Sequence, residues 1–124
     1  MGIESFPKSE RIVSQKLIDE LFTNGQRHSL AAFPLRAVYI LRQQSQGIQI
    51  LISVPKRQLR HAVDRNHVKR QLREAYRRQK SLLNALPADH SLAIAFIWQN
   101  DQILPSAQID HRMHNLLKRI AKSL

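Results

Sequence analysis

The sequence predicts an α+β fold: a small α-β-β-α-β-α sandwich, with helices packed on a mixed sheet. Three observations predict it. Apolar residues recur at helical spacing in three segments, two segments between the first and second of these are rich in β-branched and aliphatic residues, and a later run is continuously apolar. The length of 124 residues lies within the usual range of one domain, so we expect a single domain over residues 1–124.

The first predicted helix begins after Ser14, whose hydroxyl can cap its N-terminus. Asn24-Gly25 is a typical stop signal for a helix. The apolar positions between them keep a period of about 3.6 residues: Leu17, Ile18, Leu21 and Phe22. We therefore expect a short helix with one apolar face.

Two strands are expected after a polar loop and Phe33-Pro34. Residues 35–41 and 48–54 are both rich in side chains that favour strands. Only a short polar turn that ends at Gly47 separates them, which favours antiparallel pairing as a hairpin. Pro55 ends the second strand, because proline cannot donate a hydrogen bond to a sheet ladder.

The longest predicted helix covers residues 62–86, and Pro87 ends it. In a helical projection one arc is apolar and comprises Val68, Leu72, Ala75, Tyr76 and Leu83. The neighbouring arc, spread over about 100°, comprises Asn66, Lys69, Arg70, Arg73, Arg77 and Lys80. This helix is expected to pack on the core with one side and to present positive charge on the next.

A last strand and a last helix complete the predicted fold. Residues 92–98 are continuously apolar and suit a buried strand, and Asn100-Asp101 is a turn. Pro105-Ser106 then opens a helix. Its apolar positions keep helical spacing: Ile109, Met113, Leu116, Leu117, Ile120 and Leu124. We expect this helix to cover the sheet.

Charge is the most informative property of the composition. Lys and Arg number 20 against 9 Asp and Glu, which gives a net charge of +11 and a pI near 11.1. Such a charge favours polyanions. Anionic membranes would also attract it, but a membrane-surface helix needs a spare apolar face, and each helix here needs its apolar stripe for the core. We therefore expect a nucleic-acid-binding protein without a membrane partner.

Other classes are disfavoured by what the sequence lacks. Cysteine is absent, which excludes disulfides and thiolate zinc sites. The apolar runs are too short to cross a bilayer and no secretory leader opens the chain, so a cytoplasmic location is expected. With only 3 glycines there is no glycine-rich phosphate loop, and no small-molecule substrate is expected.

Residues 56–80 hold half of the Lys and Arg of the chain, offset by only two acids. The ordinary interpretation of a charge run is a solvated helix face, but such faces alternate signs at four-residue spacing. Here Lys69 with Arg73, and Arg73 with Arg77, are like-charged pairs that destabilise a helix by a few tenths of a kcal/mol each. Arginine predominates, and its planar guanidinium matches phosphate bidentately. This cluster is predicted to contact phosphate.

The same region resembles the protein component of bacterial ribonuclease P. Residues 62–77 read Ala-Val-Asp-Arg-Asn-His-Val-Lys-Arg-Gln-Leu-Arg-Glu-Ala-Tyr-Arg, similar to that family's Ala-Val, one residue, Arg-Asn-Arg, one residue, Lys-Arg, two residues, Arg-Glu. Residues 53–57 are similar to its strand end. The resemblance is good over residues 6–83 and rests on element order beyond them. Two residues depart from the family pattern: His67 replaces an arginine and Pro55 replaces a serine.

The resemblance implies the function. In that family a large RNA that uses Mg²⁺ is the catalyst, and the protein is an accessory subunit that assists endonucleolytic removal of the 5′ leader from precursor tRNA. The resemblance also implies a left-handed βαβ crossover through the long helix. Carried over by position, the residues that meet the catalytic RNA are Arg65, Asn66, Lys69, Arg70 and Arg73, with Arg77 on the same arc.

A leader-binding cleft is implied as well, between the first helix and one face of the sheet. By position, Lys56 and Arg57 line its rim. Phe22 is a candidate to stack on a leader base, with ordinary core packing as the alternative, and Tyr39 is a second candidate. Stacking tolerates any base, which suits leaders that differ between tRNAs.

A self-sufficient nuclease would need acid and base groups or metal ligands. The candidates are His61, His67, His111 and His114. The last two lie three residues apart on the last predicted helix, but no carboxylate cluster beyond Asp110 completes a site. We expect no catalytic residue and no metal site in the polypeptide. The alternative function is a purely structural RNA-binding protein, such as a ribosomal protein or an RNA chaperone.

Overall fold

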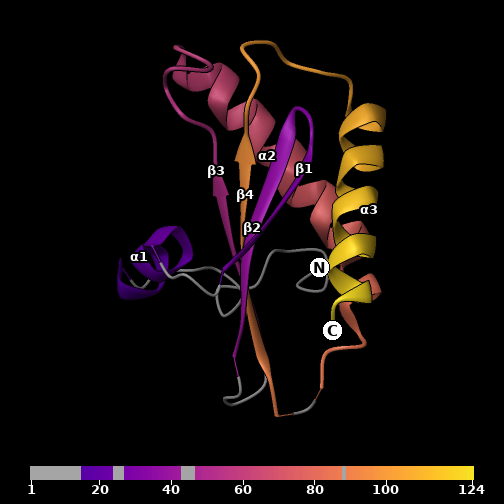
Figure 1. Cartoon of the computed structure of the whole chain (residues 1–124). Coiled ribbons are helices and arrows are strands. Elements are labelled where there is room, and N and C mark those ends of the chain that lie inside the picture. Colours follow the sequence, from indigo (N-terminus) through magenta and orange to yellow (C-terminus); the bar gives the residue numbers. More distant parts are fainter. Residues whose placement is uncertain (1–14, 24–26, 43–46, 88) are drawn as a thin grey trace, which may run out of the picture.

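The computed structural model describes residues 15–23, 27–42, 47–87 and 89–124, and it confirms the α+β class. Within this part of the chain, four strands form one mixed sheet in the order β1-β2-β4-β3 (Figure 1). The elements in chain order are α1 (Gln15–Thr23), β1 (His28–Ala32), β2 (Leu35–Arg42), β3 (Gly47–Ser53), α2 (Ala62–Gln79), the 3-10 helix η3 (Lys80–Leu83), β4 (Ser91–Trp98) and α3 (Ser106–Lys122). Every predicted element is present, and β1 is additional. The predicted cap Ser14 and stop Asn24-Gly25 lie outside the described residues.

The pairing of the strands differs from the predicted hairpin, which was wrong. β2 and β3 are not neighbours, because β4 lies between them, antiparallel to β2 and parallel to β3. Leu35 lies opposite Trp98 in one pair, and Ile50 lies opposite Ile94 in the other. β4 is almost entirely buried, and the central position covers both of its edges. The connection from β3 through α2 to β4 is a parallel crossover, as the resemblance implies, and its left hand stays a prediction.

β1 occupies a segment for which the sequence predicted a polar loop. Only Leu30 and Ala32 of this strand pack against the main core, and the other three residues are exposed. An edge strand with so few apolar residues produces no strong strand pattern. The tight turn at Phe33-Pro34 places Ala32 opposite Leu35 and so pairs β1 with β2.

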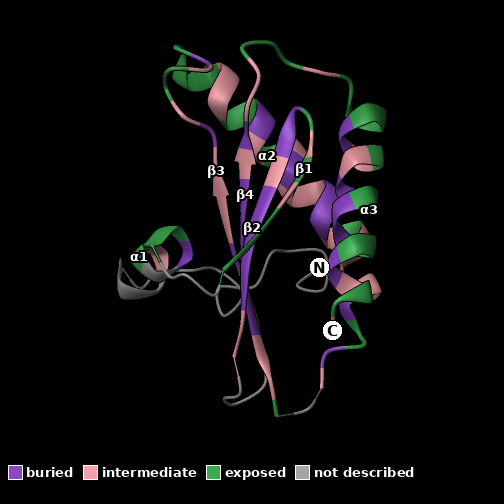
Figure 2. Cartoon of the chain, viewed as in Figure 1, coloured by how far each residue is buried: buried purple, intermediate pink, exposed green. Residues whose placement is uncertain are grey.

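The two faces of the sheet are covered differently. On one face α2 and α3 bury the main core, and the inward sides of both helices are buried while their outward sides are exposed (Figure 2). The residues that α3 buries are Ile109, Met113, Leu116, Leu117 and Ile120, as predicted. On the other face α1 covers a smaller cluster, formed by Leu21, Ile40, Ala93 and Ala95. This second face leaves more of the sheet accessible than the first.

The long helix ends earlier than the predicted residue 86. α2 stops at Gln79, whose φ of −121° and ψ of 3° leave the α-helical region, and η3 follows. Tighter 3-10 turns are common at helix ends. Leu83 and Leu86 still reach the core, which is why the apolar pattern continued to that point. None of the described helices is both long and apolar enough to span a membrane.

Candidate nucleic-acid interface

α2 is held in one orientation by the core and by α3. Its buried residues are Val68, Leu72, Ala75 and Tyr76, as predicted. On the flank toward α3, the side-chain amide of Gln71 donates to the Leu104 carbonyl (N···O 3.0 Å) and to the Ser106 hydroxyl (3.1 Å). Arg78 donates two hydrogen bonds from Nη2 to the Asp110 carboxylate, at 2.6 and 2.7 Å. These contacts prevent α2 from turning about its axis and fix the direction of its other flank.

The opposite flank of α2 carries the predicted cationic arc apart from Lys80, which lies in η3. We call it the cationic flank, and it comprises Asn66, Lys69, Arg70, Arg73 and Arg77. Asn66 and Arg70 are exposed, and the other three are half-buried. α3 packs beside β1 and β2 whereas α2 packs on β3 (Figure 1), and this flank lies on the side of α2 away from its contacts with α3. The predicted residues thus share one fixed, accessible side of a helix.

Arg65 has a structural role that the sequence did not reveal. Its Nη1 donates to the carbonyl oxygens of Leu59 (2.9 Å) and Arg60 (2.7 Å). Both carbonyls belong to the loop that leads from β3 into α2, so Arg65 ties this loop to the first turn of the helix. A guanidinium carries further N–H donors, and those remain for a phosphate. Arg65 therefore combines a loop-fixing contact with its predicted RNA contact.

Lys56 and Arg57 lie in the turn between β3 and α2. The N–H groups of Gln58 and Leu59 both donate to the Pro55 carbonyl, at 3.0 and 3.3 Å, and close this turn. Leu59 is buried and anchors the turn, whereas both basic side chains are exposed. Pro55 contributes only its carbonyl, so its missing N–H is not needed in this turn. The departure from the family pattern is therefore compatible with the observed geometry.

Glu74 lies beside the cationic flank and organises two arginines. Its carboxylate accepts hydrogen bonds from Nη2 and Nε of Arg77, the latter at 3.3 Å, and Nη1 of Arg78 lies 3.7 Å from Oε1. The hydrogen bond from Arg77 lowers the pKa of Glu74, and the charges of both arginines act in the same direction against a partial desolvation. Arg77 is thus already paired within the protein. Among the described residues, no carboxylate forms an ion pair with Lys69 or Arg70.

The sheet face beside α1 is where the resemblance places the leader cleft. Leu21 anchors α1 and is completely buried, whereas its neighbour Phe22 is 42% exposed. Core packing therefore does not account for Phe22, whose ring is accessible for stacking. Arg36, on the same face of β2 as Ile40, donates a hydrogen bond to the hydroxyl of Ser29 on β1. An exposed aromatic ring on α1 and a cation on this face of β2 are thus both available in this region.

Tyr39 is a wrong candidate for that cleft. Side chains alternate across a strand, so Tyr39 lies on the α3 side of β2 while Ile40 lies on the α1 side. Tyr39 is only 4% exposed, its hydroxyl lies 2.9 Å from Oγ of Ser123, and its ring stacks on His28 with centroids 5.0 Å apart. It supports the packing of α3 on the sheet.

The histidines considered for catalysis do not converge. Nδ1 of His114 lies 3.1 Å from Oε1 of Gln79 on α2, whereas His111 lines a pocket on the β1 side of α3. His61 and His67 are exposed near the start of α2. Within the described ranges, no group of three His, Asp or Glu side chains is arranged to hold a metal ion.

Comparison with known proteins finds a matching family model, similar sequences and a similar solved structure. A family model described as ribonuclease P matches residues 6–121. The ribonuclease P protein component of Porphyromonas gingivalis is 36% identical over 118 residues, covering 92% of this chain and 85% of the relative. That of Chlorobaculum tepidum is 31% identical over 129 residues, with 91% and 83% covered. The solved structure of the Staphylococcus aureus RNase P protein has a TM-score of 0.71 at 24% identity, over 91% of this chain and 96% of that one, a likeness of fold.

Proposed function

The chain belongs to the ribonuclease P protein family, and on this premise we propose that it is the protein subunit of a ribonucleoprotein endoribonuclease. In this role it binds a catalytic RNA and the 5′ leader of precursor tRNA, and it assists removal of the leader in tRNA 5′ maturation. The observation that carries the proposal is the cationic flank, where five side chains predicted to bind RNA lie on one fixed side of α2.

The cationic flank suits the backbone of a folded RNA. Structured RNA is recognised mainly through phosphates and 2′-hydroxyls, because side chains do not enter the deep groove of an A-form helix. Arg70 and Lys69 supply charge to phosphates, and the exposed amide of Asn66 can both donate to and accept from a 2′-hydroxyl. Because contacts with α3 fix α2, these groups are positioned before the RNA arrives.

The leader is assigned to the sheet face beside α1. The exposed ring of Phe22 offers a stacking surface there, and Arg36 on β2 offers a charge. Stacking of one base contributes about 1–3 kcal/mol without sequence preference. Lys56 and Arg57 lie in the turn between β3, an edge strand of this sheet, and α2, which carries the cationic flank. They are placed to contact the RNA backbone on either side of the turn.

We assign the chemistry to the RNA partner, with Mg²⁺ as its cofactor. The described residues do not fit a metal site of the protein, because they contain no group of three suitable ligands. The chain instead contributes positive charge between two polyanions, its own RNA subunit and the precursor. That charge offsets phosphate repulsion, so the assembly needs less Mg²⁺.

Reconstitution tests this function. The protein alone, a bacterial catalytic ribonuclease P RNA alone, and the two together are each incubated with precursor tRNA at low Mg²⁺. The proposal requires no cleavage by the protein alone and faster cleavage by the mixture than by the RNA alone. A purely structural RNA-binding protein would leave the activity and the substrate affinity of the catalytic RNA unchanged, and that result would contradict the proposal.

A further inference from the structure

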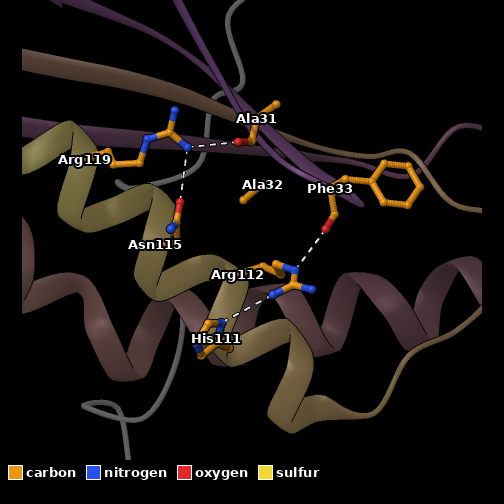
Figure 3. A pocket seen from close by; sticks show the side chains of 7 residues that line it. All are labelled: Ala31, Ala32, Phe33, His111, Arg112, Asn115 and Arg119. Carbon is orange, nitrogen blue, oxygen red and sulfur yellow. Dashed lines mark hydrogen bonds between the residues drawn. The ribbon is translucent and has the colours of Figure 1, made fainter.

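A pocket of about 280 Å³ lies between the β1 edge of the sheet and α3 (Figure 3). β1 and the turn after it contribute Ala31 and Phe33, and α3 contributes His111, Arg112, Asn115 and Arg119. The pocket is separate from the cationic flank, because Asp110 and His114 face α2 from the other side of α3. The proposed function makes no use of it.

Two arginines are held in place at this pocket. Nε of Arg112 donates to the Phe33 carbonyl at 2.9 Å, and Nη1 of Arg119 donates to the Ala31 carbonyl at 2.9 Å and to Oδ1 of Asn115 at 3.2 Å. Figure 3 shows both guanidinium groups on the side of α3 that faces β1. Each guanidinium retains further N–H donors beyond these bonds. Fixed guanidinium groups with donors to spare form a preorganised site for an anion such as phosphate.

The charges around the pocket also favour an anion as its ligand. The only acid of α3 is Asp110, which is paired with Arg78 on the far side of the helix. None of the described residues that line the pocket is acidic. If the arginines only tied α3 to β1, one hydrogen bond from each arginine would be enough for that contact. Carboxylates could then lie near the arginines without weakening the contact between α3 and β1. A lining with two arginines and no acid instead favours an external anion.

An exposed aromatic ring lies at the rim. Phe33 is 67% exposed although it is large and apolar. Its backbone is held by two hydrogen bonds, since Arg112 donates to its carbonyl and the N–H of Gln99 donates to the Pro34 carbonyl at 2.8 Å. In Figure 3 the ring points away from the two guanidinium groups, so ring and guanidiniums can engage different parts of one ligand. Charge beside an exposed ring is the combination that binds single-stranded nucleic acid.

We propose that this pocket binds a single-stranded RNA segment, with a phosphate on Arg112 and Arg119 and a neighbouring base stacked on Phe33. The inference rests on the proposed function, because the segment belongs to the RNA of the ribonucleoprotein. It gives the protein a second RNA contact, on the side of α3 that faces away from α2. The RNA would then be held on both sides of the paired helices.

A ¹⁹F label on Phe33 tests whether the pocket binds single-stranded RNA. The full chain has 4 phenylalanines, so labelling with 4-fluorophenylalanine gives few ¹⁹F resonances, and Phe33→Leu assigns the one in question. A single-stranded oligouridylate is titrated into wild type, into Arg112→Ala/Arg119→Ala, and into Lys118→Ala/Lys122→Ala. The last variant removes equal charge from the same helix at two exposed residues outside the pocket.

We expect the Phe33 resonance to shift on titration of wild type and of the lysine control. The arginine double variant should need on the order of tenfold more RNA, and its salt slope should fall by about 0.7 for each lost phosphate contact. Phe33→Tyr should keep the affinity, whereas Phe33→Leu should weaken it severalfold. Because the wild-type titration needs no variant to fold, it alone overturns the proposal if the Phe33 resonance stays still.

The same preparation is assayed with catalytic RNA, which separates the two proposals. Faster cleavage with an unshifted Phe33 resonance refutes RNA binding at the pocket and leaves the proposed function intact. A shifting resonance without faster cleavage refutes the proposed function and leaves the pocket as a general site for single-stranded RNA.

Discussion

The guanidinium of Arg78 on α2 donates two hydrogen bonds to the carboxylate of Asp110 on α3, at 2.6 and 2.7 Å. This pair joins the two helices that cover the main core. It also takes one arginine out of the basic run of residues 56–80, because Arg78 points toward α3 while the cationic flank points away from it. Neighbouring arginines of one helix therefore have different roles.

Breaking this pair should lower stability without weakening RNA binding. Its side chains are 44% and 35% exposed, so Arg78→Ala or Asp110→Asn should each reduce the free energy of unfolding by only about 0.5–1 kcal/mol. Urea unfolding of both variants and of the double variant gives the coupling energy. The salt slope of RNA binding for Arg78→Ala should stay close to wild type. A slope reduced as far as that of a cationic-flank variant would contradict the assignment of Arg78 to helix packing.

Removal of Lys69 should weaken RNA binding alone, whereas removal of Arg65 should also lower stability. Lys69→Ala should weaken RNA association and reduce the salt slope by about 0.7–0.9, with little effect on stability. Arg65→Ala should do the same and also destabilise the chain, since it leaves the Leu59 and Arg60 carbonyls without their donor. Filter binding across a salt series and thermal unfolding measure the two effects. Equal melting temperatures for the two variants would contradict the loop-fixing role of Arg65.

Glu74 should make stability depend on acid pH. Its pKa in the folded chain lies below the ordinary value of 4.5, chiefly because Arg77 donates a hydrogen bond to it. A carboxyl group with a lowered folded pKa stabilises the fold above its unfolded pKa, and this contribution is lost as pH falls through the folded pKa. Between about pH 6 and about pH 3, wild type should therefore lose more stability than Glu74→Gln. Parallel losses in urea unfolding would show that the pair does not stabilise the fold.

Leu21 and Phe22 are adjacent, but truncation of Leu21 should lower stability whereas truncation of Phe22 should lower affinity. Leu21→Ala empties a fully buried position and should reduce the free energy of unfolding by about 2–5 kcal/mol. Phe22→Ala removes an exposed ring, so it should leave stability nearly unchanged and weaken only the affinity that depends on the leader. Holoenzyme binding to tRNA with and without a leader measures this difference, with Phe22→Tyr as the conservative control. Equal weakening for both substrates would remove Phe22 from the leader site.

Periodicity predicted most of the fold because α2 and α3 each have one buried face. Val68, Leu72 and Tyr76 are buried at the spacing that the sequence indicated, and the continuous apolar run of β4 lies in the centre of the sheet. The pairing of strands was not predictable in the same way. A short turn between two strands favours a hairpin locally, but β4 buries more apolar surface between β2 and β3 than at an edge.

The candidate site was predictable where it follows one helix and not where it depends on distant segments. Asn66, Lys69 and Arg70 share a flank because helical spacing places them there. Tyr39 was misassigned because the face on which a strand residue lies depends on register, which a shift of one residue reverses. The pocket beside α3 joins segments about 80 residues apart in the chain, such as Phe33 and Arg112, and no local pattern relates them.

Site-directed crosslinking tests whether the cationic flank binds the catalytic RNA. The chain has no cysteine, so a single cysteine places a photoreactive crosslinker at one chosen position. Asn66→Cys lies on the cationic flank, and Asn84→Cys is an exposed control after η3. In the reconstituted holoenzyme, we expect crosslinks from position 66 to one discrete region of the catalytic RNA and few from position 84. Equal, scattered crosslinking from both positions would contradict this expectation.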